Sequence, residues 1–183
     1  RLFQQRVEEA ESLAATDSLT GLANRRRAEQ LMQRRIDAGQ PFSILLFDLD
    51  DFKVANDSHG HQIGDYLLQA FAKRLLGQFR AGDVACRWGG DEFLVVLDSL
   101  LPDAAGRSRE VAERMGGLYA VKTLNGPINI RVSASVGFAH HEPGESWQDL
   151  FTKADASLYR RKASQPNRDL RLDDVCTAGL PKA

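Results

Sequence analysis

The chain has 183 residues, a formal net charge of −1 at pH 7, and 43% hydrophobic and 27% charged residues. This length suits one domain with short appendages, and the composition is ordinary for a soluble globular protein. The charge provides no global field that would attract nucleic acid. The two cysteines fit a reduced cytoplasmic setting, and no apolar run approaches the roughly 20 residues of a membrane span.

The first predicted element is a helix over residues 1–15, where apolar side chains recur at helical spacing. Two interpretations of it stay open, because it has too few heptads to decide: a helix that packs on its own domain, or the end of a coiled coil from an upstream domain. A turn with capping residues follows over residues 16–21. Asn24 is placed to cap a helix over residues 25–38, which Gly39-Gln40-Pro41 ends.

A continuous apolar run over residues 42–47 predicts a strand that is buried on both faces. It ends in Asp48-Leu49-Asp50-Asp51, and a short polar helix or turn follows over residues 51–58. Carboxylates at the end of a buried strand indicate a hard-oxygen metal site, since proteins usually hold Mg²⁺ with one or two carboxylates together with phosphates and water. The sequence has neither a Walker-type phosphate loop nor a Cys/His cluster for zinc.

After a predicted helix over residues 62–77 and a turn over residues 78–83, two short apolar runs flank Gly89-Gly90. This pattern predicts a β-hairpin joined by the two glycines, which adopt positive φ without a Cβ clash. We expect Asp91 and Glu92 to point to opposite faces, because side chains alternate along a strand. The hairpin alone fits solvated surface acids or a site where a ligand lies against bare backbone.

Three predicted elements complete the chain. A helix begins after Leu101-Pro102-Asp103 and runs to about residue 120, with Leu118 and Tyr119 inward. Residues 128–139 alternate as one strand, with a close backbone approach at Gly137. The last helix covers residues 147–163, and its core stripe is Leu150, Phe151, Ala154, Leu158 and Tyr159.

Several motifs occur along the chain in a fixed order and spacing: Asp17 to Arg26, Phe47 to Lys53, Asn56-Asp57, His59-Gly60-His61, Gly64-Asp65, Gly89 to Phe93, Ser133 to Gly137, Ala154-Asp155, Leu158-Tyr159 and Lys162. Together they resemble the GGDEF domain, the diguanylate cyclase domain of bacterial signalling. The resemblance covers about residues 17–168. One departure follows Lys162, where Gln165-Pro166 replaces the Gly-Arg pair that is usual in the family.

The resemblance implies an α/β (α+β) fold with a palm-like, mostly antiparallel central sheet flanked by helices, as in nucleotidyl cyclases. It divides the chain into a linker or signalling helix (residues 1–16), a GGDEF domain (residues 17–169) and a loose tail (residues 170–183). Because the chain starts at Arg1, we expect it to come from a longer cytoplasmic or membrane-bound protein with an upstream sensor domain. We expect no membrane or nucleic-acid contact by this segment.

The activity that the resemblance implies is the condensation of two GTP into cyclic di-GMP and pyrophosphate. Each domain holds one GTP, so two domains face each other in a homodimer. Two Mg²⁺ ions per GTP, with Mn²⁺ as an alternative, would activate the 3′-hydroxyl and stabilise the leaving pyrophosphate. The implied metal ligands are Asp48, the Leu49 carbonyl and Asp91. Asp91 is also the implied proton acceptor, and Glu92 has a supporting role.

Other motif positions imply how GTP is held. Asn56 and Asp65 match the guanine-binding positions, since a carboxylate accepts from N1–H and N2–H₂ while an amide donates to O6 or N3. Asp65 also suits the first turn of a helix, where the dipole favours an acid. The remaining positions for GTP are Asp51, Phe52, Lys53, Gly89, Gly90 and Lys162.

Arg80 and Asp83 match the family's inhibitory R-x-x-D element, with five residues between Asp83 and Gly89. On their own they would form a surface ion pair of little energetic value. In this spacing they would bind the product, because Arg can fork onto guanine O6 and N7. Arg114 is either a second product contact or an exposed helix arginine.

Two alternative functions are open. One is a receptor that binds GTP or cyclic di-GMP without turnover; departures within Gly89 to Phe93 would support it, but there are none, and the Gln165-Pro166 departure is its only support. The other is an enzyme of altered base choice, against which Asp65 argues.

Overall fold

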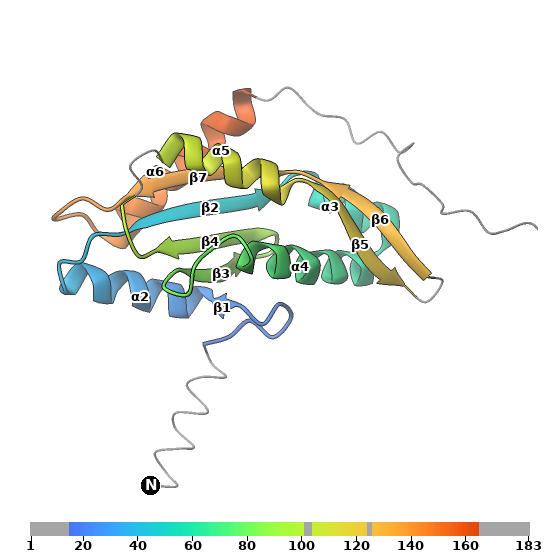
Figure 1. Ribbon diagram of the computed structural model, residues 1–183, viewed down its shortest axis with the longest axis horizontal. Coiled ribbons are helices and arrows are strands. Elements are labelled where there is room, and N and C mark those ends of the chain that lie inside the picture. The colour runs from blue at the N-terminus through green and yellow to red at the C-terminus, as the bar shows by residue number, and fades with distance from the viewer. Residues whose placement is uncertain (1–14, 101–103, 124–125, 165–183) are drawn as a thin grey trace, which may run out of the picture.

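The computed structural model describes residues 15–100, 104–123 and 126–164. A five-stranded sheet with the order β1-β3-β4-β2-β7 forms its centre, and β5 and β6 pair as a separate two-stranded sheet (Figure 1). All neighbours in the large sheet are antiparallel except β1 and β3. The mostly antiparallel sheet flanked by helices is therefore confirmed. In chain order the elements are β1 (Ala23–Asn24), α2 (Arg25–Asp37), β2 (Ser43–Leu49), α3 (Phe52–His59), α4 (His61–Leu76), β3 (Val84–Gly89), β4 (Glu92–Leu97), α5 (Ala104–Met115), β5 (Gly117–Thr123), β6 (Gly126–Val132), β7 (Ala134–His140) and α6 (Trp147–Ser164).

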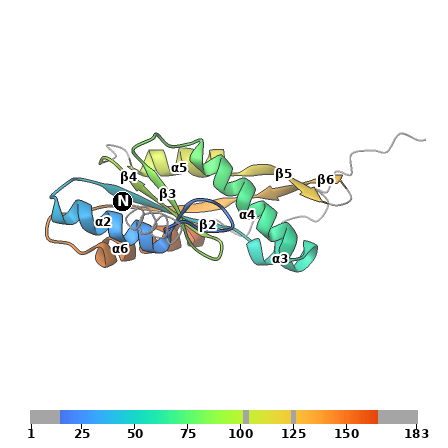
Figure 2. The ribbon, with the colours of Figure 1, turned by 90° about the horizontal axis from the view of Figure 1, so that it is seen from below.

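Helices cover both faces of the central sheet (Figures 1 and 2). Because side chains alternate along β2, Leu45 and Phe47 join the core beneath α4 and α5, whereas Ile44 and Leu46 join the core beneath α2 and α6. The strand is buried on both faces, as its unbroken apolar sequence predicts. The same alternation places Asp48, at the end of β2, on the face that α6 covers.

Gly137 sets how closely α6 lies on β7. A Cβ at this position would stand 2.1 Å from the carbonyl oxygen of Ala154 and 2.6 Å from the amide nitrogen of Leu158, both in α6. The predicted close approach is confirmed, and it places helix backbone directly against strand backbone. As a result, the C-terminal end of α6 reaches the end of β2 that carries Asp48.

The helix predicted to reach residue 120 is too long. α5 ends at Met115, and Gly117, with a φ of 119°, begins strand β5. Leu118 is 47% exposed rather than inward, while Tyr119 is buried as a strand residue. The apolar spacing of a helix and of a short strand coincide over so few residues, so the glycines rather than the spacing set this boundary.

The single strand predicted over residues 128–139 is two strands. β6 ends at Val132 and pairs with β5, whereas β7 begins at Ala134 and pairs with β2. Alternation continues across Ser133, so the pattern does not reveal that the partner changes there. The prediction that Tyr159 belongs to the core stripe of α6 is also wrong, because its side chain is 74% exposed.

Several predictions lie outside the described residues. These are the helix before residue 15, the cap at residues 101–103, the Gln165-Pro166 departure and the tail over residues 170–183. Within the described part, every helix is too short or too polar to cross a membrane.

Candidate active site

The turn of the β3–β4 hairpin differs from its prediction by one residue. Gly89 pairs with Glu92, so the two-residue connection is Gly90-Asp91 rather than Gly89-Gly90. Gly90 has the positive φ, 50°, that such a turn requires. Asp91 therefore lies in the turn itself, and its carbonyl oxygen accepts a hydrogen bond from the amide of Leu49 at 3.3 Å. This bond fixes the turn against the end of β2.

Arg87 holds the same turn from the other side. Its Nε and Nη2 donate to the carbonyl oxygen of Gly90 at 3.0 and 2.9 Å, and its Nη1 pairs with the carboxylate of Asp17 at 3.4 Å. Burial alone would raise the pKa of Asp17, but hydrogen bonds from Thr20 and the charge of Arg87 outweigh it and lower that pKa. Sequence reasoning assigned Arg87 no role.

Asp48 meets a positive charge from the far end of the chain. The Nζ of Lys162, on the last turn of α6, lies 2.7 Å from the Oδ1 of Asp48. Burial raises the pKa of Asp48, and the neighbouring carboxylates of Asp91 and Asp50 add to this; the Lys162 ammonium opposes the rise without cancelling it. The implied metal ligand and the implied phosphate-binding lysine are thus in contact.

Glu92 lies on the same face of the sheet as Asp48, at the position of β4 that pairs with Asp48 of β2. Burial raises its pKa, and the negative charges of Asp48, Asp91 and Asp155 raise it further. Several carboxylates that repel one another at a half-buried strand end are an arrangement that a cation stabilises. Asp155, which contributes to this field, was not among the predicted site residues.

The residues present fit a hard divalent cation. Asp48, the Leu49 carbonyl and Asp91 are oxygen donors at the meeting point of β2 and the hairpin turn, which is the ligand chemistry that Mg²⁺ prefers. In residues 15–100, 104–123 and 126–164, no group of three or more His, Cys, Asp and Glu side chains could hold a metal ion. The implied set contains only two carboxylates, so substrate phosphates and water would have to complete it.

The predicted guanine-binding residues come from two helices that pack together, α3 and α4. A Cβ on Gly64 would lie 1.8 Å from the Oδ1 of Asn56, so only glycine leaves room for this amide. The Oδ1 of Asn56 is buried and has no hydrogen-bond partner among the described residues. Asp65 follows Gly64 directly and is exposed. A glycine inside a helical pattern is the signal that could have indicated this contact.

α3 begins in an unusual backbone conformation. Asp51 has a φ of 58°, a left-handed value that is rare for a residue with a side chain, and it precedes the first helical residues Phe52 and Lys53. Asp51 and Lys53 are exposed, and Phe52 is partly buried against the core. The amides at a helix N-terminus favour phosphate, which fits the predicted role of this segment.

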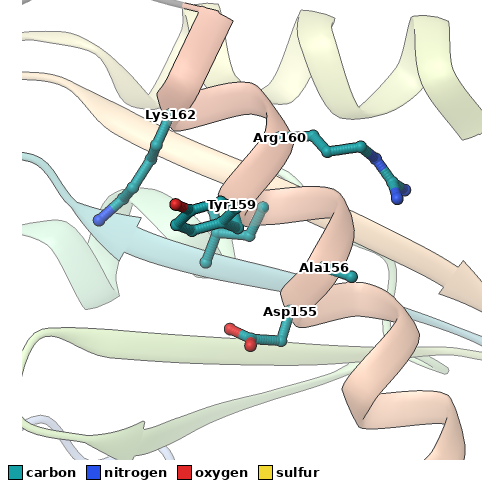
Figure 3. A pocket seen from close by; sticks show the side chains of 6 residues that line it. Asp155, Ala156, Tyr159, Arg160 and Lys162 are labelled. Atoms are coloured by element: carbon teal, nitrogen blue, oxygen red, sulfur yellow. The ribbon is translucent and has the colours of Figure 1, made fainter.

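A surface pocket of about 510 Å³ lies along α6 beside Lys162. In Figure 3, Asp155, Tyr159 and Lys162 point to one side of the helix, and Arg160 points away from them. These three residues stand four and three positions apart, a spacing that places them on one helix face. That spacing could have indicated that Tyr159 belongs to the site face rather than to the core.

Arg80 and Asp83 lie in the turn before β3, at the opposite end of that strand from Gly89. The Nη2 of Arg80 donates to the Ser99 Oγ at 3.1 Å, and the Oδ1 of Asp83 accepts from the amide of Asp98 at 3.0 Å. Arg114 contacts neither residue in the described hydrogen bonds and instead pairs with Glu110.

The comparison with known families shows to which family the chain belongs. Residues 14–168 match the family model described as "Diguanylate cyclase, GGDEF domain". The chain belongs to this family. The curated relatives include the response regulator PleD of Caulobacter vibrioides, 38% identical over 175 residues that cover 90% of this chain and 37% of PleD. Diguanylate cyclase DgcM of Escherichia coli is 39% identical over 172 residues, covering 91% of this chain and 41% of DgcM. This chain therefore spans about two fifths of the length of these relatives.

Solved structures agree with this membership. Diguanylate cyclase SiaD of Pseudomonas aeruginosa, in complex with its activator SiaC, is similar to this chain with a TM-score of 0.76 and 32% identity, over 89% of this chain and 64% of SiaD. The coiled coil and GGDEF domain of DgcB from Caulobacter crescentus, in complex with c-di-GMP, matches with a TM-score of 0.75 and 27% identity, over 91% and 90%.

Proposed function

We propose that this GGDEF domain condenses two GTP into cyclic di-GMP with release of pyrophosphate. The observation that carries the proposal is the meeting of three elements at one sheet end: Asp48 from β2, Asp91 from the hairpin turn and Lys162 from α6. Family membership gives this cluster its reaction. The proposal also places the domain in the cytoplasm, where GTP is available, downstream of a sensor domain.

Each residue of the site then has a defined task. Lys162 binds the negative triphosphate, together with Lys53 and the amides at the start of α3. Asn56 and Asp65 read the guanine edge, and Asp91 takes the proton of the 3′-hydroxyl. Asp48, the Leu49 carbonyl and Asp91 would hold Mg²⁺, which supplies Lewis-acid stabilisation of charge on phosphoryl oxygens when it is bound.

The reaction needs two copies of the domain. A single site holds one GTP, and its hydroxyl must reach the α-phosphate of a second GTP. The exposed position of Tyr159 and Lys162 on α6 leaves this face open to a facing domain. We therefore propose a homodimer of half-sites.

The turn that holds Arg80 and Asp83 is proposed as a product-inhibition site. It lies far from the hairpin turn along β3, so product bound there would act without displacing GTP. Such binding would hold two domains in an arrangement that keeps their GTP sites apart, with Arg114 as a candidate contact from a neighbour.

The decisive experiment is incubation of the purified domain with GTP and Mg²⁺, with the products identified by chromatography. We expect cyclic di-GMP from the wild type and none from Asp91→Ala, because loss of a metal ligand removes several kcal/mol of transition-state stabilisation. Asp57→Ala, which alters an exposed carboxylate on α3, is the matched control and should stay active. Product formation by Asp91→Ala at the wild-type rate would refute the assignment. GTP binding without any product from the wild type would favour the receptor alternative.

A further inference from the structure

Arg161 is bound to two other elements of the fold. Its Nη1 donates to the Oγ of Ser108 in α5 at 3.0 Å and to the carbonyl oxygen of Val136 in β7 at 3.2 Å. Ser108 is completely buried. One guanidinium therefore joins the last turn of α6 to both α5 and β7.

The Arg161 guanidinium is partly buried. Burial lowers the pKa of Arg161, the nearby charge of Arg109 lowers it further, and Glu113 partly compensates. Burial of a cation is tolerated only where hydrogen-bond acceptors compensate for the hydration that the cation loses. An exposed arginine on the outer face of α6 would avoid this cost, so the inward position calls for a reason.

The neighbouring residue supplies that reason. Successive residues on a helix differ in direction by about 100°, so a fixed direction for Arg161 also fixes the direction of Lys162. The closest contacts of Gly137 with α6 are at Ala154 and Leu158, and Leu158 lies one turn before Lys162. Beyond it, Arg161 locates the helix end, and Lys162 reaches the Oδ1 of Asp48 at 2.7 Å.

We propose that Arg161 is a positioning residue for GTP binding, which fixes the last turn of α6 so that Lys162 meets the triphosphate beside Asp48. This inference rests on the phosphate-binding role proposed for Lys162. The hydrogen bonds of Arg161 itself go to Ser108 and to the Val136 carbonyl, so its proposed role is indirect.

The test compares Arg161→Met, which keeps the apolar stem but loses every donor, with Arg34→Met, which removes an exposed arginine on α2. We expect Arg161→Met to raise the KM for GTP about tenfold, equivalent to about 1.4 kcal/mol, with kcat nearly unchanged, because binding rather than chemistry is lost. Arg34→Met should leave both constants unchanged. Ser108→Ala removes one acceptor and should give a smaller rise in KM.

A double-mutant cycle separates positioning from general stability. In a Lys162→Ala background, Arg161→Met should add no further rise in KM, because the residue through which it acts is gone. Calorimetric binding of the unreactive analogue guanosine 5′-[α,β-methylene]triphosphate with Mg²⁺ should show the same pattern. Equal effects of Arg161→Met with and without Lys162 would overturn the inference, as would an unchanged affinity.

These outcomes distinguish the inference from the proposed function. If the wild type binds the analogue but makes no cyclic di-GMP, the proposed reaction fails and the binding cycle still decides the role of Arg161. If Arg161→Met does not fold, Ser108→Ala and Arg161→Lys carry the same cycle. Thermal unfolding of each variant shows whether the compared proteins are folded.

Discussion

Gly137 leaves no room for a side chain, because the two atoms nearest to an added Cβ belong to the backbone of α6. An added methyl group would overlap the backbone of α6 at Ala154, where no flexible side chain can move aside. We expect Gly137→Ala to lower the free energy of unfolding by about 1–3 kcal/mol or more, measured by urea denaturation. Gly77→Ala is the control, because its φ is −72° and its Cβ would meet only the Arg74 carbonyl at 3.4 Å. Equal stability of the two variants would contradict the backbone contact between β7 and α6.

Cys86 gives the domain a defined sensitivity to alkaline pH. Burial, with smaller contributions from Asp17 and Glu29, raises the pKa of this thiol from 9.0 to about 12. Because the folded pKa is the higher one, the stabilising effect is complete below about pH 9 and is lost as the pH rises toward 12. We expect the free energy of unfolding to fall across this window, and less steeply in Cys86→Ala.

A labelling experiment checks the same thiol independently. In a Cys176→Ser variant, iodoacetamide at pH 8 should leave Cys86 unmodified in the folded domain and modify it in urea, because only an accessible thiolate reacts. Burial also raises the pKa of Tyr119 to about 12, so this residue contributes to the loss of stability at alkaline pH as well. That contribution remains in the Cys86→Ala variant. Rapid labelling of the folded protein would show that Cys86 is not in the core.

At the level of elements, the turn before β3 carries the proposed feedback. The Arg80 side chain is 63% exposed and is held by Ser99 and the Asp98 carbonyl, so it is oriented before any ligand arrives. Since a bidentate contact to guanine contributes about 1–3 kcal/mol, Arg80→Ala should weaken product binding by roughly one to two orders of magnitude. Turnover at low product should hardly change.

The measurement is an inhibition curve against added cyclic di-GMP. Arg26→Ala, which removes an exposed arginine on α2, is the control for the loss of one positive charge. Inhibition that is competitive with GTP, or curves that coincide for the wild type and Arg80→Ala, would show that Arg80 and Asp83 form only a surface ion pair.

Elements with a strong period were predictable from sequence. The 42–47 run gave β2, the helical patterns gave α2, α4 and α6 within a few residues, and Asn24 caps α2 by accepting from the amide of Arg27 at 3.1 Å. The β5–β6 sheet was missed because short runs such as residues 117–123 fit helix and strand alike. The change of partner at Ser133 depends on contacts between distant segments, which local alternation does not record.

The residues of the candidate site were predictable where a family motif marks their positions. They were less predictable where strand register or the direction of a side chain determines the arrangement. Asp48, Asp91 and Lys162 were expected together through family resemblance, and the structure brings them to one sheet end. The one-residue shift of the hairpin turn depends on strand register, which the Gly-Gly pair alone leaves open. Arg161 was not predicted as a site residue, because its proposed role is indirect: it sets the direction of the neighbouring Lys162.

At the scale of the whole molecule, one domain contains only half of the proposed reaction centre. Specific activity should therefore rise with enzyme concentration, because the fraction of dimer rises by mass action. The check is the initial rate per enzyme across a dilution series, with light scattering on the same samples. A constant rate per enzyme in a species that stays monomeric would rule out the half-site proposal.

The contact between Lys162 and Asp48 joins positions 114 residues apart. The ribosome synthesises Asp48 as part of β2, long before it synthesises α6. A nascent chain or a truncated product that stops before α6 lacks both the lysine and one of the two helices that cover this face of the sheet. The candidate active site is therefore completed only when synthesis of the domain is nearly finished, so a prematurely terminated chain cannot carry the site.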